Sequence, residues 1–129
     1  MTRHGLSAGL PALALAALIV PAQAQQAGDP VAGEKAFTPC KACHTVEAGK
    51  NRIGPSLHGV VGRKAGSAPG FTYSPAMANS GITWTPENIE KYLADPKAMV
   101  PGNKMAFPGL KNEQDRKNVI AYLESQAKK

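Results

Sequence analysis

The pentapeptide Cys40-Lys41-Ala42-Cys43-His44 constrains this chain more than any other feature of its sequence. A Cys-x-x-Cys-His motif is the signature of covalent, c-type haem attachment. The spacing lets two thiols form thioether bonds to the vinyl groups of one porphyrin, while the adjacent imidazole coordinates the iron. We therefore predict one covalently bound haem c, held by Cys40 and Cys43, with His44 as an axial iron ligand.

Two other interpretations of the two cysteines have less support. A thioredoxin-like redox pair would require the strand–helix context of an α/β fold, which the sequence pattern does not indicate. A structural zinc site would require four ligands, and no second Cys/His pair is placed to complete the set.

An iron held by His44 needs a second axial ligand on its other face. The candidates are His58, Met77, Met99 and Met105. Met105 lies in the irregular, proline-stiffened segment 101–109, which could cross the ring and present its thioether. Methionine is also a common filler of apolar cores, so the residues alone leave the choice between ligand and filler open.

The first residues have the layout of a secretory signal peptide. A short basic start is followed by the apolar stretch 6–20 and by Pro21-Ala22-Gln23-Ala24, which has the small-x-small pattern of a cleavage site. We predict a cleaved signal peptide over 1–24 and an exported domain over 25–129, which places the protein in the periplasm. The alternative is a membrane anchor, but the apolar run of about 15 residues is shorter than the ~20 needed to cross a bilayer.

The charge and composition limit both partners and core. The chain has a net charge of +6, with basic residues scattered rather than clustered, which favours an acidic protein face as partner over nucleic acid. With three Phe, three Tyr and one Trp, the core is small. A domain of this size needs stabilisation beyond its apolar core. A disulfide between cysteines so close in sequence would add little stability, so a group attached to the two cysteines is the better candidate.

Three segments predict helices, and each begins with a helix cap. The first runs from Asp29-Pro30 to about residue 38, the second from Thr85-Pro86 to residue 95, and the third from Asn112 to the C-terminal lysines. Gly33 inside the first costs about 1 kcal/mol against alanine, which suggests that another helix crosses closely there.

Two long glycine- and proline-rich loops separate these helices, over residues 45–84 and 95–110. Loops of this length in a compact domain are uncommon unless they are functional or wrap around something. A haem would give both loops an interior object to pack against. The predicted fold is therefore all-α, with one domain of about three main helices and long loops around one covalent haem.

Taken together, these features resemble class I cytochromes c, in particular the mitochondrial type and its short bacterial relatives. The likeness covers the whole of the predicted exported domain. The matching motifs, in order, are Gly33 with Phe37, Cys40-x-x-Cys43-His44, Ile53-Gly54-Pro55-Ser56-Leu57-His58-Gly59, Gly62-Arg63-Lys64, Ala68-Pro69-Gly70-Phe71-Thr72-Tyr73-Ser74, Gly81-Ile82-Thr83-Trp84, Tyr92-Leu93, the Met105 loop and Ile120-Ala121-Tyr122-Leu123.

The resemblance implies a set of axial contacts. Met105 would be the second axial ligand, Tyr92 would donate toward its sulfur, and the Pro55 carbonyl would accept the proton of the haem histidine. The sequence departs from the family at Met77, where a buried Asn is usual.

The resemblance also implies how the rest of the haem is held. Tyr73 and Trp84 would hydrogen-bond a buried propionate, with Arg63 offsetting its charge, and Phe107 would wall the pocket. Asn103 stands where the family usually has a Thr beside the propionate. Because of this departure, the family pattern says little about the role of Asn103.

The function implied is that of a monomeric one-electron carrier and not an enzyme. The family's donor is a quinol-oxidising cytochrome complex, and its acceptor is a terminal oxidase or a photosynthetic reaction centre. By resemblance, the acidic faces of such partners would meet a basic ring around the haem edge, formed by Lys41, Arg52, Lys97, Lys104 and Lys111. Two alternatives are a haem enzyme or gas sensor with a vacant iron face, and an uncleaved, membrane-tethered cytochrome.

Overall fold

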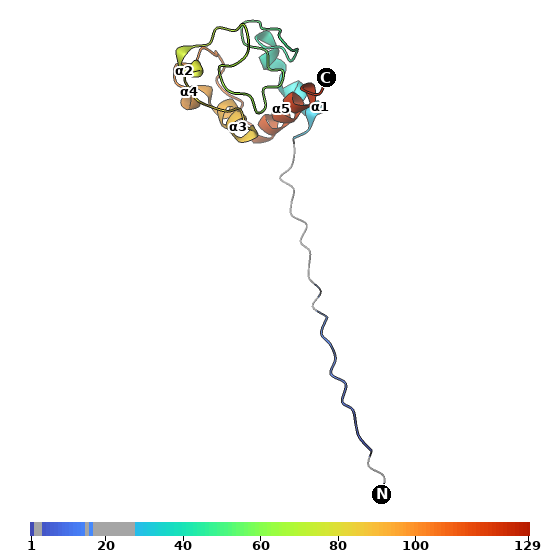
Figure 1. Cartoon of the computed structure of the whole chain (residues 1–129). Coiled ribbons are helices and arrows are strands. Elements are labelled where there is room, and N and C mark those ends of the chain that lie inside the picture. Colours follow the sequence, from blue (N-terminus) through green and yellow to red (C-terminus); the bar gives the residue numbers. More distant parts are fainter. Residues whose placement is uncertain (2–3, 15, 17–27) are drawn as a thin grey trace.

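A computed structural model describes residues 1, 4–14, 16 and 28–129 (Figure 1). The predicted cleavage site after Ala24 lies outside these residues. Residues 4–14 are exposed and have no regular secondary structure. None of the helices in the described part of the chain is long and apolar enough to cross a membrane.

The folded part is built from short helices and long loops, which confirms the all-α prediction. Lys64 and Thr83 form an isolated antiparallel bridge. The helices are α1 (Pro30–Ala36), the 3₁₀ helix η1 (Thr38–Ala42), α2 (Pro75–Ala78), α3 (Pro86–Ala94), α4 (Pro96–Met99) and α5 (Glu113–Gln126).

The predicted caps begin the three longest α-helices. The side chains of Asp29, Thr85 and Asn112 each accept a hydrogen bond from a backbone N–H in the first turn. Two single-turn helices, α2 and α4, fall where the sequence analysis expected loops. Both start with the same signal, a capping side chain followed by proline, at Ser74 and Asp95. Hydrophobic periodicity could not predict these two helices, because four residues are too few to show a helical period.

The N-terminal and C-terminal helices pack closely against each other, as Gly33 predicted. A Cβ atom at Gly33 would overlap the backbone carbonyl of Asn118 on α5 and would lie 2.8 Å from the Cβ of Tyr122. The Phe37 ring, at the end of α1, lies 5.2 Å from the Tyr122 ring between centroids. This crossing fixes where the chain leaves α1, and therefore where the cysteine motif begins.

The long stretch between η1 and α3 folds back on itself instead of forming one open loop. Gly62 N–H donates to the Trp84 carbonyl at 2.7 Å, and Trp84 N–H donates to the Arg63 carbonyl at 2.8 Å. In Figure 1 this stretch, drawn mostly in green, arches over the side opposite α3 and α5. The pairing brings Arg63 beside Trp84, although they are far apart in sequence.

The loop between α4 and α5, which carries Met105, is held at its C-terminal end by Arg116 of α5. The Nη1 of Arg116 donates to the carbonyls of Leu110 at 2.9 Å and Lys111 at 3.0 Å. Its other terminal nitrogen lies 3.8 Å from Glu90 of α3. The guanidinium thus joins the end of the loop to two helices.

Candidate haem-binding site

The loops and helices enclose a cavity of about 540 Å³ with a mostly apolar lining. This volume falls within the ~300–1,000 Å³ typical of sites that enclose a small molecule or cofactor. Every residue predicted to bind the haem lines this cavity: Cys40, Cys43, His44, Pro55, Arg63, Tyr73, Trp84, Tyr92, Asn103, Met105 and Phe107.

The attachment motif enters the cavity from a tight turn. Cys40 lies in η1, and Cys43 ends it, so the two side chains belong to one compact turn. Their thiols are not joined to each other. Burial raises the pKa of the Cys40 thiol to about 11, with a further contribution from Cys43. Both sulfurs are thus available for bonds to a third group.

The His44 imidazole is held by contacts to Gly54 and Pro55. Its Nδ1 lies 2.7 Å from the Pro55 carbonyl, and an Nδ1–H donated to that oxygen leaves Nε2 with a free lone pair. Burial lowers the pKa of His44, although the Pro55 hydrogen bond acts in the opposite sense. The ring packs against Gly54, where a Cβ would overlap the imidazole. A neutral imidazole whose Nε2 lone pair is free is the form that can bind a metal ion.

Met105 lines the same cavity from the loop between α4 and α5. The Tyr92 hydroxyl lies 4.0 Å from its sulfur, the contact expected from the resemblance. Burial raises the pKa of Tyr92 to about 12, so this hydroxyl stays protonated and can donate. The backbone N–H of Met105 is held separately by the Asn103 side chain at 2.8 Å.

The other candidate axial ligands are placed less favourably. His58 has its Nδ1 at 3.1 Å from the Val46 carbonyl, and it is not among the residues lining the cavity in the described part of the chain. Met99 packs against the hydrophobic core. Met77 does line the cavity. The choice of thioether therefore lies between Met105 and Met77, and only Met105 has the Tyr92 hydroxyl as its partner among the hydrogen bonds of the described residues.

A half-buried cation on the cavity wall, Arg63, fits a group that carries carboxylates. Arg63 donates to the carbonyls of Ser56 at 2.9 Å and His58 at 3.2 Å, but its buried Nε has no partner among the described residues. Burial lowers the pKa of Arg63. Tyr73 accepts from Ala68 N–H at 3.0 Å, which leaves its own hydroxyl proton to donate. A haem propionate would provide the missing acceptor.

Asn103 also lines the cavity, but its amide hydrogens are donated to the two ends of the preceding helix, α4. Both hydrogens of its side-chain amide are donated to backbone carbonyls, those of Pro96 at 3.0 Å and Val100 at 2.9 Å. The resemblance places this residue beside a propionate, whereas in the structure both of its donors bond to backbone carbonyls at the ends of α4.

Several lining residues were not assigned by the sequence analysis. Most are apolar and come from helices or from the folded-back loop: Ile53, Val60, Phe71, Ile89, Val119 and Leu123. Val119 and Leu123 belong to an apolar stripe at helical spacing in the last helix, with Ile120 and Tyr122. Such periodicity indicates burial, but it does not distinguish a face toward other side chains from a face toward a cofactor.

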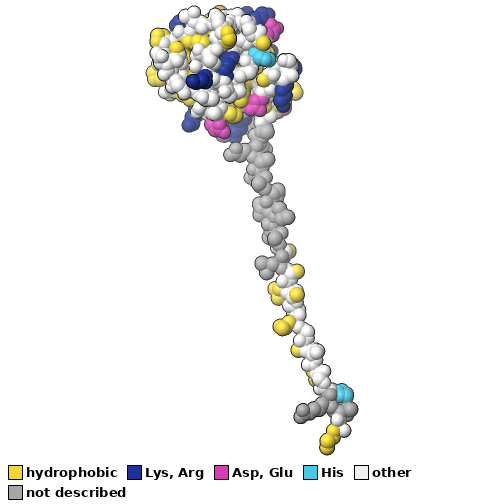
Figure 2. Space-filling model, in the orientation of Figure 1, with side chains coloured by type: hydrophobic (Ala, Val, Ile, Leu, Met, Phe, Trp, Pro, Cys, Tyr) yellow, Lys and Arg dark blue, Asp and Glu magenta, His cyan; other side chains and the backbone are white. Residues whose placement is uncertain are grey.

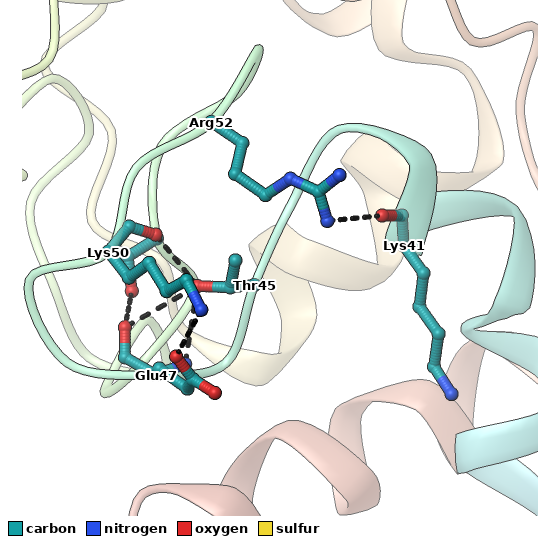
Figure 3. Close-up of polar contacts among 6 residues, drawn as sticks. Lys41, Thr45, Glu47, Lys50 and Arg52 are labelled. Atoms are coloured by element: carbon teal, nitrogen blue, oxygen red, sulfur yellow. Dashed lines mark hydrogen bonds and ion pairs between the residues drawn. The ribbon is translucent and has the colours of Figure 1, made fainter.

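Part of the predicted basic ring lies beside the attachment turn. Figure 3 shows Arg52 reaching to the Lys41 backbone carbonyl, at 3.4 Å from its Nη1, while the Lys41 ammonium points away. Thr45 closes the adjacent turn by donating to the Lys50 carbonyl at 2.7 Å. Lys97 shares a surface depression with Phe107, and Lys104 lines the cavity itself. Four of these five cations therefore lie at or near the site, and Lys111, farther along the same loop as Lys104, donates to the Pro108 carbonyl at 3.4 Å.

Comparison with known proteins gives consistent matches. Residues 30–127 match the family model described as Cytochrome c. The chain is 57% identical over 112 residues to cytochrome c2 of Rhodomicrobium vannielii, covering 86% of this chain and 90% of that protein. It is 50% identical over 113 residues to cytochrome c-554 of Methylosinus trichosporium, covering 87% and 86% respectively. Among solved structures, cytochrome cH from Methylobacterium extorquens matches with a TM-score of 0.73 and 52% identity, covering 76% of this chain and 99% of that one.

Proposed function

Because this chain belongs to the cytochrome c family, it is an electron carrier with one covalently bound haem c, and we propose that His44 and Met105 are the axial ligands of its iron. Cys40 and Cys43 would supply the thioether bonds. One observation carries the assignment. A single apolar cavity collects both thiols, an imidazole with its Nδ1 at a carbonyl, and a thioether next to a buried hydroxyl.

The residues around the site define what the protein does with the group. When bound, the haem supplies an iron that gains and loses one electron. A thioether opposite an imidazole favours a higher potential than two imidazoles would. The apolar walls would keep water away from the group, Tyr73 and Trp84 would donate hydrogen bonds to a propionate, and the Arg63 guanidinium would offset its charge. If His44 and Met105 hold the iron from its two faces, no coordination position would remain for oxygen or peroxide, so we assign transfer of electrons and no catalysis.

Visible spectra of the purified protein test this assignment. We expect a c-type spectrum that changes reversibly on reduction, a one-electron potentiometric titration, and a weak long-wavelength band of the ferric iron–thioether bond. The pigment should stay with the protein in acidified organic solvent. Pigment lost to the solvent would contradict the thioethers, and carbon monoxide binding at neutral pH would favour a haem enzyme or gas sensor.

The surface supports docking to acidic faces of larger redox proteins. Lys and Arg side chains are spread over the face shown in Figure 2. Lys41 has an ion-pair partner, Glu34, at 4.0 Å, but both side chains are exposed, so the pair is weak. Lys104 lies at the cavity mouth and has no ion pair within the described residues. We propose that a quinol-oxidising cytochrome complex donates electrons and that a terminal oxidase or reaction centre accepts them from a monomeric carrier.

Electron-transfer rates to such a partner should fall with added salt. We expect the second-order rate constant to drop roughly tenfold or more between low and high ionic strength, within the ~10–10³-fold range of electrostatic steering. Stopped-flow kinetics at several salt concentrations measure it. Lys104→Gln should flatten the salt dependence, whereas Lys128→Gln, the same charge change at the exposed C-terminus, should not. A flat profile for the unmodified protein would contradict docking at this face.

The segment before the domain supports export. We propose that residues 1–24 are a signal peptide removed after Ala24, so that the carrier works in the periplasm. The intact mass of the protein from its native host tests this. A mass that includes residues 1–24 would indicate the membrane-tethered alternative.

A further inference from the structure

The loop that carries Met105 has little backbone hydrogen bonding of its own. Between residues 101 and 109, two backbone N–H groups reach backbone carbonyls in the described structure: Asn103 to Val100 at 3.1 Å, and Phe107 to Met105 at 2.9 Å. At the far end, Leu110 N–H donates to the Leu93 carbonyl at 2.6 Å. The conformation around Met105 must therefore be held by side chains.

Asn103 supplies these contacts, and it uses all the hydrogen-bonding capacity of its amide hydrogens to do so. Its Nδ2 donates to the carbonyls of Pro96, the first residue of α4, and Val100, the residue that ends α4. Its Oδ1 accepts the N–H of Met105 at 2.8 Å. One half-buried amide thus connects the start of α4, the end of α4 and the backbone of Met105.

The Asn103 contact is distinct from the one made by Tyr92. The Tyr92 hydroxyl approaches the Met105 sulfur, at the tip of the side chain. Asn103 holds the backbone from which that side chain projects. Pro96 is among the most buried of the described residues. The Asn103 amide therefore connects the Met105 backbone, by hydrogen bonds, to a residue of the core.

We propose that Asn103 is the positioning residue for Met105: it acts through the loop backbone, and both hydrogens of its amide are donated to backbone carbonyls and not to the haem. The proposal rests on Met105 being the axial ligand, as proposed above. It predicts that the Asn103 amide sets how often the loop opens and withdraws the thioether. An Asn side chain bonds the backbone N–H two residues on more strongly than a Ser or Thr hydroxyl does, so this chain's Asn should hold the loop better than Thr would.

Two measurements on the haem-loaded protein test this. The first is hydrogen exchange of the Met105 amide by NMR. In Asn103→Ala it should accelerate roughly tenfold or more, because the net strength of a few hydrogen bonds is lost. The second is the apparent dissociation constant of added imidazole for the ferric protein. It should tighten by a similar factor, because an external ligand binds only the fraction of molecules in which the loop is open. Asn103→Thr should fall between Ala and the native residue in both.

Asn51→Ala is the matched control. The Asn51 amide also bridges backbone groups, donating to the Pro69 carbonyl and accepting from Ser56 N–H, both at 2.9 Å, but in another loop. It should lower global stability in denaturant without changing Met105 exchange or imidazole affinity. Equal behaviour of Asn103→Ala and Asn51→Ala, or of Asn103→Ala and the native protein, would overturn the proposal. If the native ferric protein lacks the iron–thioether band, the ligand assignment itself fails. In that case, slow Met105 exchange that depends on Asn103 would show that Asn103 stabilises the loop without positioning an iron ligand, and this result would overturn the proposal.

Discussion

Met105→Ala is expected to turn a closed electron carrier into a protein whose iron binds external ligands. The haem should remain attached through Cys40 and Cys43, because the substitution is remote from both thiols in sequence. The long-wavelength ferric band should disappear, and the ferrous protein should bind carbon monoxide at neutral pH. The reduction potential should fall by on the order of a few hundred mV, within the ~0.8 V span that axial ligands control. Optical spectra and a potentiometric titration measure these changes.

Two methionine variants serve as controls for this experiment. Met99→Ala removes a half-buried side chain that packs on the core, so it should cost stability but leave the iron spectrum unchanged. Met77→Ala removes the other thioether that lines the cavity. It should also retain the ferric band. If Met77→Ala lost the band while Met105→Ala kept it, the assignment of the axial thioether would be reversed.

Gly33→Ala is expected to destabilise the whole domain, against the usual helix preference. An alanine in a helix interior normally gains about 1 kcal/mol over glycine. Here the added Cβ would overlap the carbonyl of Asn118, and a backbone atom cannot move aside as a flexible side chain can. We expect a net loss of about 2 kcal/mol or more, typical of an overpacked core. This is a large part of the ~5–15 kcal/mol stability of a small protein.

Denaturant unfolding of the haem-loaded protein measures this loss. Lys35→Ala, at an exposed position of the same helix, is the matched control and should change the unfolding free energy little. Because Cys40 follows α1 closely, the displaced helix should also lower the yield of protein with attached haem. A Gly33→Ala protein as stable as the native one would contradict the close crossing of α1 and α5.

Much of the fold could be predicted from local signals. The caps at Asp29, Thr85 and Asn112 placed the three longest α-helices because a cap acts within one turn of chain. The same signal at Ser74 and Asp95 marks the start of α2 and α4, but these two helices were not predicted from it. The pairing of Gly62 with Trp84 could not be foreseen, because it joins residues separated by a long irregular loop.

The sequence by itself determined the attachment chemistry, because two thiols and an imidazole within five consecutive residues have a spacing that the chain cannot alter by folding. It also limited the candidates for the second axial ligand to a few side chains, of which the family resemblance favoured Met105. Only the tertiary structure decided that Met105 lies in the same cavity as the motif, that the Nε of Arg63 is buried there without a partner among the described residues, and that Asn103 bonds both α4 and the backbone of Met105. These contacts depend on how loops distant in sequence close over one interior space, and no local pattern of residues specifies that.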